Sequence, residues 1–280
     1  MRLGEFGVWT TYRAIGEESA GAAASLVEKL GFGTFWLGGS PQLPALRPLL
    51  EATERIVVAT GILNVWASEP ERVASDFGEL EARFPGRVLL GIGIGHPEAT
   101  STYRKPLAAM QAFLYGLDTA ETPVRQTRRC LAALGPKMLE LSAERSLGAH
   151  TYFVPAEHTQ AARKLLGETS ILAPELACVL DDDVESARAK ARNYAALYLG
   201  LRNYTNNLLN HGFSQRDIHD GGSDRLIDTI IPHGDAGAIS EAARQHLSAG
   251  ADHVCLQTVG VTGIPRSEWT ALATALGLKR

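Results

Sequence analysis

Short apolar runs alternate with segments of helical periodicity along the whole chain. Leu3–Trp9 and Thr34–Leu37 are such runs, and Glu17–Leu30 between them repeats Ala, Leu and Val at helical spacing up to Gly31. Ile56–Ile62 is continuous and β-branched, as a strand buried on both faces should be. This alternation is typical of repeated βα units around a parallel sheet.

The pattern predicts eight strands, at Leu3–Trp9, Thr34–Leu37, Ile56–Ile62, Val88–Ile94, Arg129–Leu134, Tyr152–Val154, Leu172–Leu180 and His253–Val259. Helices are expected at Ser68–Phe84, Pro136–Gly148 and Val184–Leu209, followed by a polar, glycine-rich loop at Asn210–Gly222. Eight alternations without a linker favour an α/β fold with one closed (β/α)8 TIM barrel, a single domain over residues 1–280. The alternative is an open flavodoxin-like or Rossmann-like sheet with an appended helical part.

Composition narrows the class of protein. The 280 residues are 45% hydrophobic and 21% charged, which predicts a globular chain with a full core. The net charge is only -4 and the basic residues are scattered, so neither nucleic acid nor an anionic membrane surface is an expected partner. A small-molecule substrate is expected instead.

The cysteines and the N-terminal residues indicate the compartment. Cys130, Cys178 and Cys255 lie far apart, each within an apolar run, which predicts reduced thiols in the core and no disulfide framework. The first residues lack the apolar stretch of a secretory signal, and no run approaches the ~20 apolar residues of a membrane span. We therefore expect a cytoplasmic protein without membrane contact.

Residues at the carboxyl ends of the strands are the first candidates for a binding site, because ligands of parallel barrels bind there. Gly91, Gly93 and Gly95 alternate along GIGIGHPE, which removes side chains from a strand end and would let a flat ligand or a phosphate approach the backbone. A kink where the barrel closes is the structural alternative. The spacing is not that of a dinucleotide fingerprint.

Two further strand ends carry candidate chemistry. In LGPKM (134–138), glycine frees the turn, Pro136 suits the first helical position, and the following amides with Lys137 predict an anion site. The alternative is an ordinary helix start with a solvated lysine. TGILN (60–64) ends a buried strand and by itself indicates no chemistry.

His96 follows the glycine-rich strand and is the ionisable side chain nearest to it in sequence. It is either a proton donor or a hydrogen-bonded structural residue. The other histidines form no metal-binding motif, because HxH, HExxH and CxxC are absent, so no metal site is expected. The chain also lacks a GxSxG elbow and a P-loop, which argues against a serine hydrolase and an NTPase.

Five segments resemble, in their order, the luciferase-like monooxygenase class of barrels, and most of all its F420-dependent branch. They are FWLGGS (35–40), ATGILNVW (59–66), GRVLLGIGIGH (86–96), AALGPKMLELSAE (132–144) and GADHVCLQ (250–257). The resemblance implies a bulge after the third strand with a non-prolyl cis peptide at Gly61-Ile62, behind the tricyclic ring of the cofactor. It also implies that the tail phosphate rests on backbone near Ala133 to Lys137.

The resemblance thus implies a coenzyme site and a catalytic histidine. His96 would lie close to the ring, and the cofactor-binding residues would be Gly38, Gly61, Ile62, Asn64, Gly93, Gly95, Ala133, Leu134, Gly135, Pro136 and Lys137. Candidates for the substrate side are Trp9, Trp66, Tyr103, Gly38 and the segment 203–207 (NYTNN), with core packing as the alternative for each aromatic residue.

The activity implied is hydride transfer between coenzyme F420 and a small organic substrate, in a cytoplasmic homodimer. Gly38, Gly39 and Ser40 stand where some dehydrogenases of the family carry an acidic residue and a histidine, which argues against sugar-phosphate dehydrogenation. An FMN-dependent monooxygenase is the enzymatic alternative. A non-catalytic barrel that binds a deazaflavin as a carrier is the alternative from another class of protein.

Overall fold

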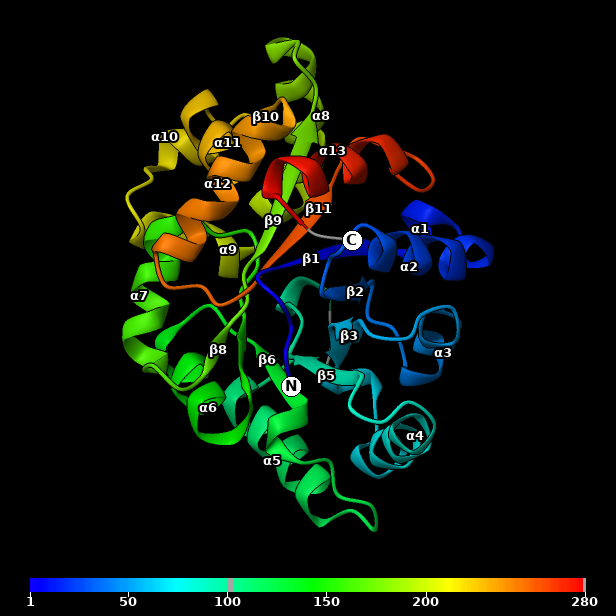
Figure 1. Cartoon of the computed structure of the whole chain (residues 1–280). Helices are drawn as coiled ribbons and strands as arrows, with labels where there is room; N and C mark the ends of the chain where they lie inside the picture. The colour runs from blue at the N-terminus through cyan, green and yellow to red at the C-terminus, as the bar shows by residue number, and fades with distance from the viewer. Residues whose placement is uncertain (100–102, 279–280) are drawn as a thin grey trace.

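A computed structural model describes residues 1–99 and 103–278 (Figure 1). Its strands are β1 Phe6–Thr11, β2 Thr34–Gly38, β3 Val57–Gly61, β4 Leu63–Asn64, β5 Val88–Gly93, β6 Arg129–Ala132, β7 Gly148–His150, β8 Ile171–Leu172, β9 Glu175–Leu180, β10 His233–Gly234 and β11 Val254–Thr258. They pair in parallel in the order β10-β9-β11-β1-β2-β3-β5-β6-β7-β8, with β4 beside β5. The expected α/β fold with a parallel sheet is confirmed.

The helices lie around the outside of this curled sheet (Figure 1). They are α1 Tyr12–Ile15, α2 Ala20–Lys29, α3 Arg47–Glu51, α4 Pro70–Arg83, α5 Pro106–Thr119, α6 Pro136–Arg145, α7 Ala156–Leu166, α8 Val184–Leu199, α9 Arg202–Asn210, α10 Gln215–Ile218, α11 Asp224–Ile230, α12 Ala236–Ser248 and α13 Arg266–Leu276. Within the described ranges, no helix combines the length and the apolar character that a bilayer crossing requires.

Both faces of the sheet are buried, which explains why its strands are nearly continuous apolar runs. In β2, Phe35 and Leu37 pack into the large cluster under the helices, whereas Trp36 between them packs into a separate cluster on the other face. The three cysteines are buried as expected. Burial raises the pKa of the Cys130 thiol to about 12, so this side chain packs as a neutral group.

The sixth predicted strand is misplaced. Tyr152–Val154 is not a strand, because β7 lies just before it at Gly148–His150 and Phe153 adopts a φ of 55°, in the left-handed region. The aromatic residues that suggested a strand instead pack beside α8 and α9. The seventh predicted strand is interrupted, since β8 and β9 are separated by Ala173 and Pro174.

The segment from β8 to β9 reaches strands on both of its sides. The N–H of Glu175 donates to the carbonyl of Thr151, 2.8 Å away, next to β7. The N–H of Cys255 in β11 donates to the carbonyl of Pro174 at 2.9 Å. Because the strands are all parallel, their carboxyl ends lie at the same edge of the curled sheet, where the candidate site lies.

Candidate functional site

A cavity of about 520 Å³ opens at the carboxyl ends of β2, β3, β5, β6 and β7. Its described lining residues are Trp9, Gly39, Ser40, Gly61, Ile62, Gly93, Ile94, Gly95, His96, Tyr103, Pro106, Ala132, Ala133, Leu134, Gly135, Met138, His150, Tyr152, Tyr198, Asn203, Tyr204, Asn206, Asn207 and Asn210. This lining contains no lysine, arginine, aspartate or glutamate. The size suits a small-molecule ligand.

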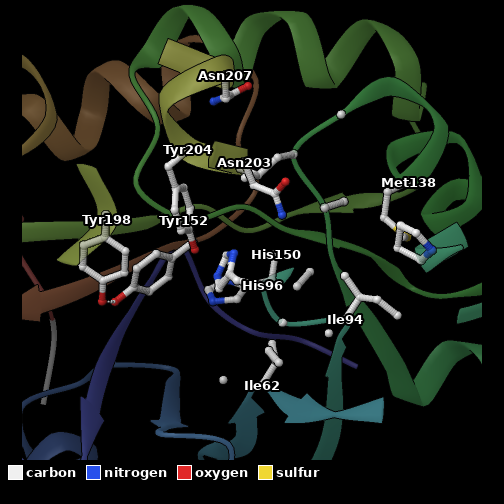
Figure 2. A pocket seen from close by; sticks show the side chains of 18 of the residues that line it. Ile62, Ile94, His96, Met138, His150, Tyr152, Tyr198, Asn203, Tyr204 and Asn207 are labelled. Carbon is white, nitrogen blue, oxygen red and sulfur yellow. Dashed lines mark hydrogen bonds between the residues drawn. The ribbon is translucent and has the colours of Figure 1, made fainter. Parts of the chain in front are cut away.

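The end of β3 forms one side of the cavity. The Gly61–Ile62 peptide is cis, as the resemblance implies, and both residues line the cavity. Figure 2 shows the Ile62 side chain at the base of the cavity, below His96. This expectation from the sequence is confirmed.

Two glycines on this side leave room for the indole ring of Trp9. A Cβ on Gly38 would lie 2.0 Å from Cη2 of Trp9, and one on Gly61 would lie 2.5 Å from its Nε1. Trp9 lines the cavity, whereas Gly38 does not. Gly38 therefore affects the site by leaving room for Trp9. Gly38 was predicted to bind the cofactor, but it is not among the residues that line the cavity.

The alternate glycines of β5 are explained first by packing against the neighbouring strand. A Cβ on Gly91 would lie 1.9 Å from the carbonyl oxygen of Thr60, and one on Gly93 would lie 2.3 Å from Cδ1 of Ile62. The glycines make room for the bend after β3. Of the three, only Gly93 and Gly95 line the cavity.

Most of the predicted site residues meet in this cavity. The lining contains His96, Gly61, Ile62, Gly93, Gly95, Ala133, Leu134, Gly135, Trp9 and Tyr103. Four members of the segment 203–207 also line it, from α9. The predicted residues outside the lining are Gly38, Asn64, Pro136, Lys137 and Trp66.

The residues outside the lining have structural roles or lie at the surface. Asn64 caps a short turn, since its Oδ1 accepts from the N–H of Trp66 at 3.0 Å. Trp66 Nε1 donates to the carbonyl of Ile94 at 2.7 Å and so holds the end of β5. Pro136 and Lys137 are exposed at the start of α6. Gly135 just before them faces open space.

His96 lines the cavity with its ring 5.0 Å from that of Tyr204 on α9. Its Nδ1 is buried without a hydrogen-bond partner among the described residues. Burial lowers the pKa of His96, although the nearby carboxylate of Glu98 acts in the opposite direction. The imidazole is consequently neutral at pH 7 and offers one donor and one acceptor.

His150, at the end of β7, is a site residue that the sequence analysis missed. Its Nδ1 lies 2.7 Å from the carbonyl of Ala173, so Nδ1 carries the proton and donates it. Its ring stacks on Trp36 at 4.5 Å, and its Nε2 is buried without a partner in the described chain. Burial lowers the pKa of His150 to about 4. The side chain thus presents a fixed hydrogen-bond acceptor to the cavity.

Two tyrosines from different parts of the chain also line the cavity, and neither was predicted from the sequence. Tyr152 follows β7 and Tyr198 lies on α8, and their hydroxyls meet at 2.9 Å beside the cavity (Figure 2). Burial raises the pKa of both phenols. Both hydroxyls therefore remain protonated at physiological pH.

Four buried polar atoms around the cavity have no partner in the described parts of the chain. They are Nε1 of Trp9, Nδ1 of His96, Nε2 of His150 and Nδ2 of Asn207. Buried polar atoms in folded proteins are almost always hydrogen-bonded. These four therefore point to a ligand with both donor and acceptor groups, which the cavity could orient without any charged side chain.

About the first two fifths of the chain match the model of a known family. Residues 3–115 match the model of the luciferase-like monooxygenases. The resemblance predicted from the strand ends is thereby confirmed. No curated protein matches the chain.

Solved structures share the whole fold. An F420-dependent secondary alcohol dehydrogenase in complex with an F420-acetone adduct is 14% identical, with a TM-score of 0.78 over 100% of both chains. The coenzyme F420-dependent tetrahydromethanopterin reductase of Methanopyrus kandleri is 14% identical, with a TM-score of 0.75 over 100% of both chains. The oxygenating constituent of 3,6-diketocamphane monooxygenase of Pseudomonas putida, in complex with FMN, is 11% identical, with a TM-score of 0.71 over 98% of this chain and 96% of that chain.

Proposed function

We propose that the chain is an oxidoreductase that uses a deazaflavin coenzyme of the F420 type to transfer hydride to or from a small, uncharged organic substrate. The observation that carries the proposal is the uncharged cavity at the strand ends, with its four unpartnered buried polar atoms. The family match and the F420-dependent structural relatives support the choice of coenzyme. FMN is the alternative, supported by the FMN-bound relative.

The cavity fits a flat ring system with polar edges. Gly61, Ile62, Gly93 and Gly95 offer backbone and one aliphatic side chain, and a Cβ on Gly135 would meet nothing within 4 Å. We assign these residues to the ring and Ala133 to Gly135 to the anionic tail. When bound, the coenzyme would supply the hydride chemistry, and the protein would supply position and electrostatics.

The substrate class follows from the charge of the lining. A charged substrate would lose its hydration in the cavity without gaining an ionic partner, which is unfavourable by several kcal/mol. A neutral compound with a carbonyl or hydroxyl group would meet His96 and the acceptor Nε2 of His150. We assign His96 the catalytic role of hydrogen-bonding the substrate or moving its proton.

We also infer that the parallel sheet closes into a (β/α)8 barrel, one domain over residues 1–280. The support is the segment from β8 to β9, which bonds to the Thr151 carbonyl on one side and to Cys255 on the other. A closed barrel would hold the strand ends in a ring around the cavity.

Titration of the purified chain with F420 and with FMN, followed by tryptophan fluorescence, tests the coenzyme. We expect tighter binding of F420, followed by hydride transfer with at least one neutral carbonyl or alcohol in a substrate screen. His96→Gln should keep coenzyme affinity and lower turnover by ~100-fold, whereas His219→Gln, at an exposed histidine, should change neither.

Three other results would contradict the coenzyme, the enzymatic activity or the role of His96. Equal or tighter binding of FMN would replace the coenzyme assignment. Binding of F420 without turnover of any acceptor would favour a carrier over an enzyme. A His96→Gln variant with normal turnover per folded molecule would make His96 a packing residue.

A further inference from the structure

A buried carboxyl group is connected to the cavity by tyrosine hydroxyls. Oε1 of Glu175 lies 3.4 Å from the hydroxyl of Tyr194, which lies 2.7 Å from that of Tyr152. Tyr152 in turn contacts the hydroxyl of Tyr198 at 2.9 Å. Only Tyr152 and Tyr198 line the cavity, so Tyr194 and Glu175 lie behind them.

Three parts of the fold bring this chain of hydroxyls together. Glu175 begins β9, Tyr152 follows β7, and Tyr194 and Tyr198 are one helical turn apart on α8. Oε1 of Gln257 on β11 accepts from Tyr152 at 2.8 Å and from Tyr194 at 3.1 Å. Gln257 therefore holds the two phenols in place. Its Oε1 is an acceptor for each phenol, as an alternative to the neighbouring hydroxyl.

Among the residues that the structure describes, no cation pairs with Glu175 to balance a negative charge. It is 1% exposed, and within the described residues it forms no salt bridge, while its Oε2 accepts only from the N–H of Phe153 at 3.3 Å. An unpaired carboxylate in such a place is strongly disfavoured. Burial accordingly raises the pKa of Glu175 to about 8, and the group carries a proton at neutral pH.

The other titratable groups around Glu175 do not supply charge either. They come from the segment after β7, from α8, α9, β9 and β11, and are Tyr152, Tyr194, Tyr198, Tyr204, Cys178 and Cys255. Burial raises the pKa of every one of them. All are neutral where Glu175 titrates, so Glu175 is the group in this cluster that exchanges a proton near neutral pH.

We propose that Glu175 stores the proton for reduction of a neutral carbonyl substrate and delivers it through Tyr194, Tyr152 and Tyr198. The proposal rests on the proposed function, which supplies the two-electron donor as a reduced deazaflavin. It goes beyond that function by naming the direction of the reaction and the proton source, and it leaves His96 the role of hydrogen-bonding the substrate.

The atoms and charges of this step balance. As hydride adds to the carbonyl carbon, the π bond breaks and the substrate oxygen takes the proton of the Tyr198 hydroxyl. Tyr198 regains a proton from Tyr152, Tyr152 from Tyr194, and Tyr194 from the carboxyl of Glu175. The immediate products would be an alcohol, a Glu175 carboxylate and the oxidised coenzyme, which would still hold the second hydrogen of its reduced form as a proton. Release of that proton by the coenzyme and uptake of one proton from water by Glu175 would restore the charges before the next turnover.

The first test uses carbonyl reduction by the chain with reduced coenzyme, measured across pH. We expect kcat of the wild type to be constant below about pH 8 and to fall above it, as Glu175 loses its proton. Glu175→Gln and Tyr198→Phe should each lower kcat by ~100-fold, with KM changed less than ~3-fold, and Glu175→Gln should abolish the fall near pH 8. Tyr115→Phe, at a tyrosine that is 66% exposed on α5, is the matched control.

A purely structural Glu175 would give a different result. Glu175→Gln would then lose thermal stability but keep the kcat and the pH profile of the wild type, which would overturn the proposal. Should Glu175→Gln fail to fold, Tyr198→Phe at the cavity end decides, because normal kcat in that variant would equally overturn the relay. Wild type that binds coenzyme but reduces no carbonyl would also overturn it.

The second test is infrared spectroscopy of the chain without coenzyme. A protonated carboxyl band that persists to near pH 8, disappears in Glu175→Gln and shifts in Tyr194→Phe would support proton storage along the hydroxyls. Absence of such a band would overturn it. If the wild type binds no deazaflavin, the proposed function is wrong. The infrared measurement still shows whether Glu175 holds a proton that is coupled to Tyr194, because it needs no coenzyme.

Discussion

The side of the cavity built from residues before 100 consists mostly of backbone and apolar groups, whereas the side built from residues after 148 carries hydroxyls, amides and a fixed imidazole. On the first side, Trp9 and Ile62 occupy the space that glycines leave open. On the second, Tyr152, Tyr198 and His150 present polar atoms to the same cavity. Apart from His96, the first side sets a shape, and the second provides most of the polar groups.

The family match follows the same division. Residues 3–115 match the luciferase-like monooxygenase model and contain the cis peptide and the glycine-rich end of β5. The polar side lies outside the matched range. We infer that the first side specifies the type of cofactor and that the second side, together with His96, contacts the substrate, because one fold supports many chemistries through the residues placed at its strand ends.

The largest effect that distinguishes the two sides is expected in acid. His150, His158, His246 and His253 all lie in the second part of the chain, and burial lowers the pKa of each to about 4 from 6.5. Their stabilisation is fully present above pH 6.5 and is lost as the pH falls toward 4, by roughly 1.4 kcal/mol per pH unit for each. Together the four protonations should lower the free energy of unfolding at pH 4 by on the order of 10 kcal/mol.

Urea unfolding at a series of pH values between 7 and 4 measures this loss. His246→Gln should unfold with a shallower dependence on pH, since it takes up one proton fewer. His219→Gln, at an exposed histidine, should keep the dependence of the wild type. Equal dependence in all three proteins would mean that the buried histidines do not control acid unfolding.

A smaller effect on stability should come from adding a methyl group to a glycine of β5, next to the first side of the cavity. Gly91→Ala would place a Cβ 1.9 Å from the Thr60 carbonyl, which is backbone and cannot rotate away. We expect a loss of about 3 kcal/mol in the free energy of unfolding, the upper part of the usual range for overpacking. Gly135→Ala is the matched control, because a Cβ there meets nothing within 4 Å, and it should change stability by less than ~0.5 kcal/mol.

If Gly91→Ala were as stable as Gly135→Ala, the glycines of β5 would not be required by the bend after β3. Close approach of a ligand to Gly93 and Gly95 would then be the remaining reason for the glycines that line the cavity, as the sequence first suggested. Urea denaturation of both variants at pH 7 decides between these explanations.

The sequence was informative where local pattern determines structure. Alternation of apolar runs and helical segments located β2, β3 and β5, since strands buried on both faces read as continuous apolar runs. It misplaced β7 because aromatic residues suggested a strand at 152–154, where the positive φ of Phe153 prevents one. The helices α9, α10 and α11 were not recognised as separate elements, because 184–209 was interpreted as one helix and 210–222 as a loop. The local signals were the capping residues Ser214 of α10 and Ser223 of α11.

The first side of the site could be predicted because its residues follow one another at successive strand ends. The polar side could not, since Tyr152, Tyr194 and Glu175 are brought together only by the tertiary fold. One signal was available: Glu175 is the single charged residue in the apolar run 171–180. A charge within a buried strand requires a partner or a proton, and so indicates a site.

The smallest effect is expected at the turn between the two sides, where the exposed Lys137 begins α6 beyond the lining residue Gly135. An exposed ion pair contributes at most about 1 kcal/mol, so Lys137→Ala should weaken F420 binding by no more than ~5-fold at low salt. Lys164→Ala, at an exposed lysine on α7, should leave binding unchanged. Fluorescence titration at two salt concentrations checks both variants. A loss of 100-fold with reduced salt dependence would show that Lys137 turns toward the bound anion, and the anion site would then include its charge as well as the backbone at Gly135.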